Sequence, residues 1–185
     1  MRLFLSLAIP DNVKTHLVEV IQRLKPIASE VTWCTRDQLH VTLAYLGEIS
    51  PAILPHVTTA CSRVGAVCDS FTCRAYGFGF FGTKRNPKIL WAGIDPNLSL
   101  LTLQETLWKE LDKYGFKNEE SLFRPHIMLG RCLNKARNHP LIEEMDLSEE
   151  VAFGSWQATA ITLFECRLTP KGEHYRRLAQ TPLGM

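Results

Sequence analysis

The sequence predicts an α+β fold in which two similar lobes of antiparallel sheet and helices surround a central groove. Strand-like and helix-like segments alternate from the amino terminus, and "HVTL" at residues 40–43 returns as "HIML" at residues 126–129. Each segment is a histidine that opens an apolar strand after a helix and a short polar link. A repeat at half the chain length indicates two lobes related by a pseudo-twofold axis, which would bring both histidine strands side by side.

The first half of the chain opens with a strand and a helix. Residues 2–10 ("RLFLSLAIP") are predicted to form a strand, and from Asp11 the apolar residues recur at helical spacing, with Asp11 as a candidate N-cap. The short apolar segment 31–33 precedes the histidine strand at residues 39–48. Alternation along a strand predicts that His40, Thr42 and Ala44 share one face and that Val41, Leu43 and Tyr45 share the other.

The second half continues the same alternation. A helix is expected over residues 51–67, and a second runs to Gly115 with leucines on one side at 100, 103, 107 and 111. Strands are predicted at residues 71–80 and 89–94, and His126 opens another within residues 123–131. Residues 153–168 and 174–183 alternate like a closing hairpin or an added sheet edge.

Composition and charge limit the class of protein. The chain is 45% hydrophobic over 185 residues, which is enough for a core without disulfides or metals, and its six cysteines form no Cys-x-x-Cys pair. The apolar start is too short for a signal peptide or a membrane span. We therefore expect a cytoplasmic monomer in which residues 1–185 form one domain of two interleaved lobes. A formal charge of +2 argues against binding long nucleic acid by charge alone.

His40 and His126 are the candidate catalytic residues. Imidazole, with an unperturbed pKa of about 6.5, can give or take a proton near neutral pH, and two histidines across a groove can serve as acid and base. A lone strand histidine is more often a hydrogen-bonded core residue, but the repeated context favours chemistry. Arg124 and Arg131 flank the second histidine and suit an anionic substrate.

The segment "LHVTLAYLGE" resembles the first motif of the two-histidine (2H) phosphoesterases, which carry two His-x-Thr/Ser-x motifs. The closest branch is the RNA 2′,3′-cyclic phosphodiesterases, also called 2′-5′ RNA ligases. The resemblance spans nearly the whole chain, since "RLFLSLAIP", "VTW", "ILWAGI", "FRPHIMLGR" and "HYRRLAQTPL" occur in the family's order.

The resemblance implies the 2H phosphoesterase fold and hydrolysis, without metal or other cofactor, of a terminal 2′,3′-cyclic phosphate to a 2′-phosphate, with 2′-5′ RNA ligation as the reverse reaction. The partners would be RNA ends or nucleotides that carry the cyclic phosphate. By carry-over, His126 is the proton acceptor, His40 the proton donor, and Thr42 and Arg131 bind phosphate. Strict alternation would point Arg131 away from His126, so its role requires a bulge or strand end near Gly130.

Met128 departs from the family pattern, which has threonine or serine at this position. A thioether cannot donate the expected hydrogen bond. One alternative is therefore a non-catalytic module that binds nucleotides or RNA ends. Another alternative is a metal-dependent phosphohydrolase, but the sequence shows no cluster of carboxylates and histidines that could hold two metal ions.

Three further groups of residues lack a comparable repeated pattern. His16, His56, His139 and His174 are expected at the surface or at helix ends. The basic loop containing Lys84, Arg85 and Lys88 is expected to be solvated or to touch RNA phosphates. Four aromatic residues are core candidates, one of which could stack on the terminal base at the groove rim: Trp33, Tyr45, Phe81 and Trp91.

Overall fold

The structure of the protein is a computed structural model. It describes residues 1–95, 97–119, 122–133, 141, 143, 151–170 and 172–184. His139, one of the histidines considered above, lies outside these residues.

The predicted strand and helix at the amino terminus are both present. Strand β1 is Arg2–Leu7, and helix α1, Asp11–Leu24, buries the five apolar residues whose spacing predicted it: Val13, Leu17, Val20, Ile21 and Leu24. The predicted N-cap is wrong by one residue. Pro10 occupies the N-cap position, and the carboxylate of Asp11 pairs instead with Arg36 at 3.0 Å. A proline there already has the extended backbone that a cap requires and has no N–H to satisfy.

The remaining elements follow the predicted order. Two further α-helices are α2, Leu54–Gly65, and α3, Leu98–Asp112; α3 buries Leu100, Leu103, Leu107 and Leu111 as expected. Short 3-10 helices are η1 (Lys25–Ile27), η2 (Arg36–Gln38) and η3 (Pro51–Ile53). The strands are β2 (Val31–Trp33), β3 (Val41–Glu48), β4 (Phe71–Thr83), β5 (Asn86–Ile94), β6 (His126–Cys132), β7 (Ala152–Ala158), β8 (Ala160–Thr169) and β9 (Gly172–Pro182).

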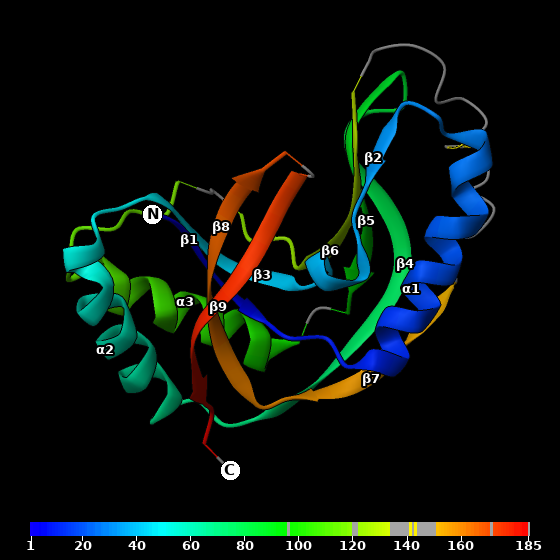
Figure 1. The fold of residues 1–185 in the computed structure, drawn as a ribbon. Coiled ribbons are helices and arrows are strands. Elements are labelled where there is room, and N and C mark those ends of the chain that lie inside the picture. The colour runs from blue at the N-terminus through cyan, green and yellow to red at the C-terminus, as the bar shows by residue number, and fades with distance from the viewer. Residues whose placement is uncertain are drawn as a thin grey trace.

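The strands of the described residues join one antiparallel sheet. Its order is β7-β4-β5-β6-β3-β1-β8-β9, and the short β2 pairs with β6. The sheet curls strongly, so that β8 and β9 lie opposite β2 and β5, with β3 between the two arms of the sheet (Figure 1). The predicted α+β architecture is confirmed, and the two halves are arms of one continuous sheet.

The strand order explains how the arms interleave. Strands β3 and β6 are neighbours, β1 and β8 continue the sheet from β3, and β5 and β4 continue it from β6. Helix α1 packs on β7, α2 on β8 and β9, and α3 on β3 and β4 (Figure 1). The helices therefore cover the convex side of the curled sheet (Figure 1).

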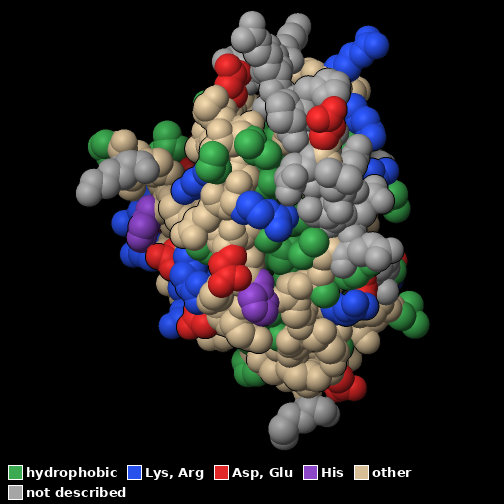
Figure 2. Space-filling model, turned by 90° about the vertical axis from the view of Figure 1, so that its right-hand side faces the viewer, with side chains coloured by type: hydrophobic (Ala, Val, Ile, Leu, Met, Phe, Trp, Pro, Cys, Tyr) green, Lys and Arg blue, Asp and Glu red, His purple; other side chains and the backbone are tan. Residues whose placement is uncertain are grey.

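The outer surface carries mixed charge. Figure 2 shows the side of the molecule that bears α1, where basic and acidic side chains are interspersed and do not gather into one field. This distribution agrees with the formal charge of +2. No helix among the described residues is long and apolar enough to cross a membrane.

Candidate active site

The two histidine motifs meet at the centre of the sheet. Val41 of β3 pairs with Ile127 of β6, and both side chains are fully buried in the core. Continuing this antiparallel register by one residue on each side puts Thr42 opposite His126 and His40 opposite Met128. Directly opposed residues have Cβ atoms about 5 Å apart, so the four side chains form one cluster on the groove side of the sheet. The predicted meeting of the two motifs is confirmed.

Both imidazoles are held by the same hydrogen bond. Nδ1 of His40 lies 2.7 Å from the carbonyl oxygen of Gln38, and Nδ1 of His126 lies 2.7 Å from that of Arg124. A carbonyl only accepts, so Nδ1 carries the hydrogen in each ring and donates it. This fixes the tautomer and makes Nε2 the acceptor atom of each ring.

His40 is enclosed by aromatic rings. Phe4 of β1 stacks on it at 4.7 Å between centroids, and Tyr175 of β9 meets it edge-on at 5.5 Å. Burial lowers the pKa of His40 to about 4, and positive charge on His126 acts in the same direction. In the unliganded protein His40 is therefore neutral at pH 7. Its Nε2 lies 3.0 Å from the Thr42 hydroxyl, which then donates to it.

His126 has aromatic neighbours of its own. Phe81 contacts its ring edge-on at 4.9 Å, and the Trp91 ring lies 6.4 Å away. The Trp91 ring is seated over Gly79, where an added Cβ would come within 2.1 Å of it. Met128 pairs with Trp91 across β5 and β6 and offers a thioether where Thr42 offers a hydroxyl.

Arg131 follows a bulge in β6, as its predicted role requires. Gly130 pairs with Leu90 and Met128 with Trp91, so Leu129 is an extra residue on β6. The extra residue shifts the alternation and lets Arg131 rejoin the face that carries His126. Gly130 is needed here, because a Cβ would lie 2.6 Å from the Val31 side chain. The phosphate-binding role of Arg131 itself stays a prediction.

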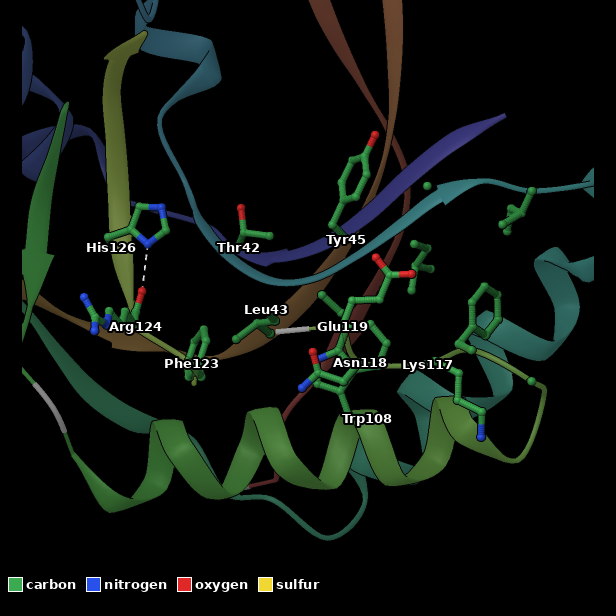
Figure 3. A pocket seen from close by; sticks show the side chains of 16 residues that line it. Thr42, Leu43, Tyr45, Trp108, Lys117, Asn118, Glu119, Phe123, Arg124 and His126 are labelled. Carbon is green, nitrogen blue, oxygen red and sulfur yellow. Dashed lines mark hydrogen bonds between the residues drawn. The ribbon is translucent and has the colours of Figure 1, made fainter. Parts of the chain in front are cut away.

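Tyr45 does not lie where strict alternation placed it. Ser6 of β1 pairs with Thr42 and Leu5 with Ala44, so Leu43 is an extra residue on β3. Ala44 is consequently buried in the core, whereas Tyr45 is 55% exposed. In Figure 3 the Tyr45 side chain extends from β3 on the same side as Thr42. The prediction that Tyr45 shares the core face and Ala44 the histidine face is therefore wrong.

A pocket of about 550 Å³ opens beside His126. Thr42, Arg124 and His126 line one end of it, and Tyr45, Trp108 and Glu119 line the other (Figure 3). Its size suits a nucleoside, and its mixture of aromatic and polar groups is typical of small-molecule sites. Of these residues, Thr42, Arg124, His126 and Tyr45 were candidates from the sequence, whereas Trp108 and Glu119 carried no signal there.

The other histidines lie elsewhere. Nδ1 of His16 is 2.9 Å from the Phe153 carbonyl oxygen, His56 stacks on Tyr114, and His174 is exposed on β9. Within the described parts of the chain, no three His, Cys, Asp or Glu side chains are grouped so that they could hold a metal ion.

Comparison with known proteins identifies the family. Residues 9–168 match the model of the 2′-5′ RNA ligase superfamily. A Thermotoga maritima protein named RNA 2′,3′-cyclic phosphodiesterase is 32% identical over 181 residues, covering 96% of this chain and 93% of that protein. A protein of the same name from Archaeoglobus fulgidus is 26% identical, with coverage of 96% and 98%.

Solved structures show the same fold. A Thermus thermophilus crystal structure superposes with a TM-score of 0.85 at 27% identity, covering 99% of this chain and 98% of that one. E. coli LigT in complex with 3′-AMP superposes with a TM-score of 0.82 at 23% identity, with coverage of 100% and 98%. Together with the paired histidine motifs, these matches show that the chain belongs to the 2′-5′ RNA ligase superfamily, whose members are 2H phosphoesterases.

Proposed function

We propose that this protein is an enzyme that hydrolyses the 2′,3′-cyclic phosphate at an RNA 3′ end and leaves a 2′-phosphate. The observation that carries the proposal is the pair of histidines with matched Nδ1 hydrogen bonds and both Nε2 atoms on one side of the sheet. Such a pair can move two protons in one displacement at phosphorus. The names of the relatives support the same substrate.

Each proton has an assigned path. Nε2 of His126 accepts a proton from the attacking water, the new oxygen bonds to phosphorus, and the bond from phosphorus to O3′ breaks. Nε2 of His40 donates a proton to the departing O3′, so the phosphate remains on O2′. The direction of this assignment follows the family resemblance, because the local symmetry of the site treats the two histidines alike.

His40 must gain a proton before it can act as the acid. Its pKa of about 4 describes the unliganded site, where burial disfavours the charged ring. A phosphate anion beside the ring favours the charged form and raises the pKa. The Thr42 hydroxyl, now bonded to Nε2 of His40, would then turn to a non-bridging phosphate oxygen. Arg131 supplies a second contact to the anion.

We assign Tyr45 as the residue that stacks on the terminal base. Its exposed ring shares a pocket with Thr42 and His126. Stacking on an aromatic ring is the usual way in which proteins hold an unpaired RNA base. With a 5′-hydroxyl in place of water as the nucleophile, the same displacement would form a 2′-5′ linkage as the bond from phosphorus to O3′ breaks and O3′ takes up a proton.

The test is turnover of a nucleoside 2′,3′-cyclic phosphate in the presence of a chelator. We expect hydrolysis by the wild type with EDTA present and none above background by the His40→Ala/His126→Ala double variant. Hydrolysis that requires an added metal would overturn the two-histidine mechanism.

The alternative of a non-catalytic binding module rests on Met128, which removes one hydroxyl from the second motif. Tight binding of the cyclic nucleotide without turnover, measured by calorimetry and product analysis on one preparation, would favour that alternative.

A further inference from the structure

The pocket beside His126 has a polar end that the proposed reaction does not use. Lys117, Asn118 and Glu119 follow α3 and line the pocket at the end away from His126 (Figure 3). Nζ of Lys117 pairs with Asp112 at 2.5 Å, and in Figure 3 its side chain points away from Tyr45. The Glu119 carboxylate extends toward the side of the pocket where Tyr45 lies (Figure 3). No ion pair among the described residues engages this carboxylate.

The spacing along β3 suits one nucleotide. Three strand residues span roughly 10 Å, so a phosphate held at Thr42 leaves room for a ribose before the base reaches the ring of Tyr45. A base stacked on that ring would turn its edge to the residues that line the same end of the pocket. Glu119 is the residue there that offers only hydrogen-bond acceptors.

We propose that Glu119 makes this pocket selective for guanine as the terminal base, an inference that rests on the proposed function. Guanine presents two adjacent donors on one edge, N1–H and the N2 amino group, which match the two oxygens of a carboxylate. Adenine and cytosine place a ring acceptor beside their amino donor, and uracil has one N–H between two carbonyls. Three of the four bases therefore set an acceptor against the Glu119 carboxylate.

The size of the preference follows from the exposure of Glu119. A good bidentate contact gives roughly ten- to a hundredfold discrimination between bases. Glu119 is exposed to solvent and its charge is screened, which places the effect at the low end. We expect guanosine 2′,3′-cyclic phosphate to be preferred over the adenosine compound by about tenfold in kcat/KM.

The experiment measures kcat/KM of the wild type for the four nucleoside 2′,3′-cyclic phosphates, and Kd for the guanosine and adenosine 2′-monophosphates by calorimetry. Both measurements are repeated with Glu119→Gln. The glutamine amide keeps one acceptor but sets an NH₂ group against a guanine donor, so the ratio of guanosine to adenosine should fall from about ten to about one or two.

A matched control removes the same charge outside the pocket. Glu105 is an exposed residue of α3 that does not line the pocket at His126, and Glu105→Gln should keep the wild-type ratio. Equal rates with all four bases, or a guanosine preference that survives Glu119→Gln, would overturn the inference and leave the proposed function standing. Absence of all turnover would overturn the proposed function, and the Kd ratio would then decide the guanine preference by itself.

Discussion

The two histidine motifs share one backbone plan and differ in what they present to the groove. In each, the ring donates from Nδ1 to the carbonyl two residues earlier, and aromatic rings support it. The first motif is more enclosed, with Phe4 stacked on His40 and the Thr42 hydroxyl at Nε2. The second opens into a pocket and has Met128 in place of a hydroxyl.

Two histidines on similar backbone can therefore have different surroundings and different charge states. Antiparallel pairing of Val41 with Ile127 brings the rings of His40 and His126 together, and this pairing is made by the backbone. Burial and neighbouring groups then set the charge state of each ring separately, and for His40 they favour the neutral form. Removal of either ring, and exchange of the residues that differ between the motifs, should therefore have unequal effects on the rate.

The largest expected effect is the loss of either ring. His40→Ala and His126→Ala should each lower kcat by about 10²- to 10⁴-fold, because each removes one proton-transfer group. The measurement is steady-state hydrolysis of a nucleoside 2′,3′-cyclic phosphate. His56→Ala is the matched control, since His56 stacks on Tyr114 away from the groove, and its rate should equal that of the wild type. Near-normal turnover in either groove variant, with unchanged circular dichroism, contradicts the mechanism.

A smaller effect is expected from the residues that distinguish the motifs. A hydrogen bond to a charged group is worth about 1.5 to 3 kcal/mol, so Thr42→Val should lower kcat/KM by roughly ten- to a hundredfold. Met128→Thr should raise it by about tenfold, the low end of the same range, because Arg131 and water would already contact the phosphate. A lower KM would mean that the new hydroxyl binds the ground state, and a higher kcat that it acts only in the transition state.

The double variant Thr42→Val/Met128→Thr completes a cycle. If the two positions are equivalent contacts to one phosphate, moving the hydroxyl from the first motif to the second should recover part of the lost rate. An unchanged or reduced kcat/KM in a folded Met128→Thr variant means that the methionine is not a degraded phosphate contact and that the groove is shaped for another substrate.

The smallest expected effect is a displacement in the pH profile. A proton donor loses activity as pH rises through its pKa, and for His40 in the free enzyme this pKa is about 4. Bound phosphate raises it, so the basic limb of kcat should lie at higher pH than the basic limb of kcat/KM, by about one unit or more. Each limb reports the coupled pair of histidines. If the two basic limbs coincide within error, bound phosphate does not raise the pKa of His40.

The sequence predicted the elements and the motifs well, because both depend on local patterns. The apolar spacing of Leu100, Leu103, Leu107 and Leu111 marks the buried face of α3 without any tertiary information. The repeat at His40 and His126 likewise predicted that the two histidine strands lie side by side, as β3 and β6 do.

The environment of the site could not be predicted in the same way. A bulge at Leu43 exchanges the faces of Ala44 and Tyr45, and a bulge is a property of strand pairing that period-two alternation cannot reveal. Glu119 lies in an irregular segment with no periodic signal. Phe4 reaches His40 only because β1 pairs with β3. A bulge near Gly130 was predicted only because the role of Arg131 required one.

The proposed displacement breaks the bond from phosphorus to O3′ and keeps the bond to O2′, and the position of the product phosphate shows which bond is broken. A short RNA ending in a 2′,3′-cyclic phosphate is incubated with the wild type and chelator, and the product is identified by ³¹P NMR against authentic 2′- and 3′-phosphate ends. We expect the 2′-phosphate alone. A 3′-phosphate, or a mixture of the two, would contradict it.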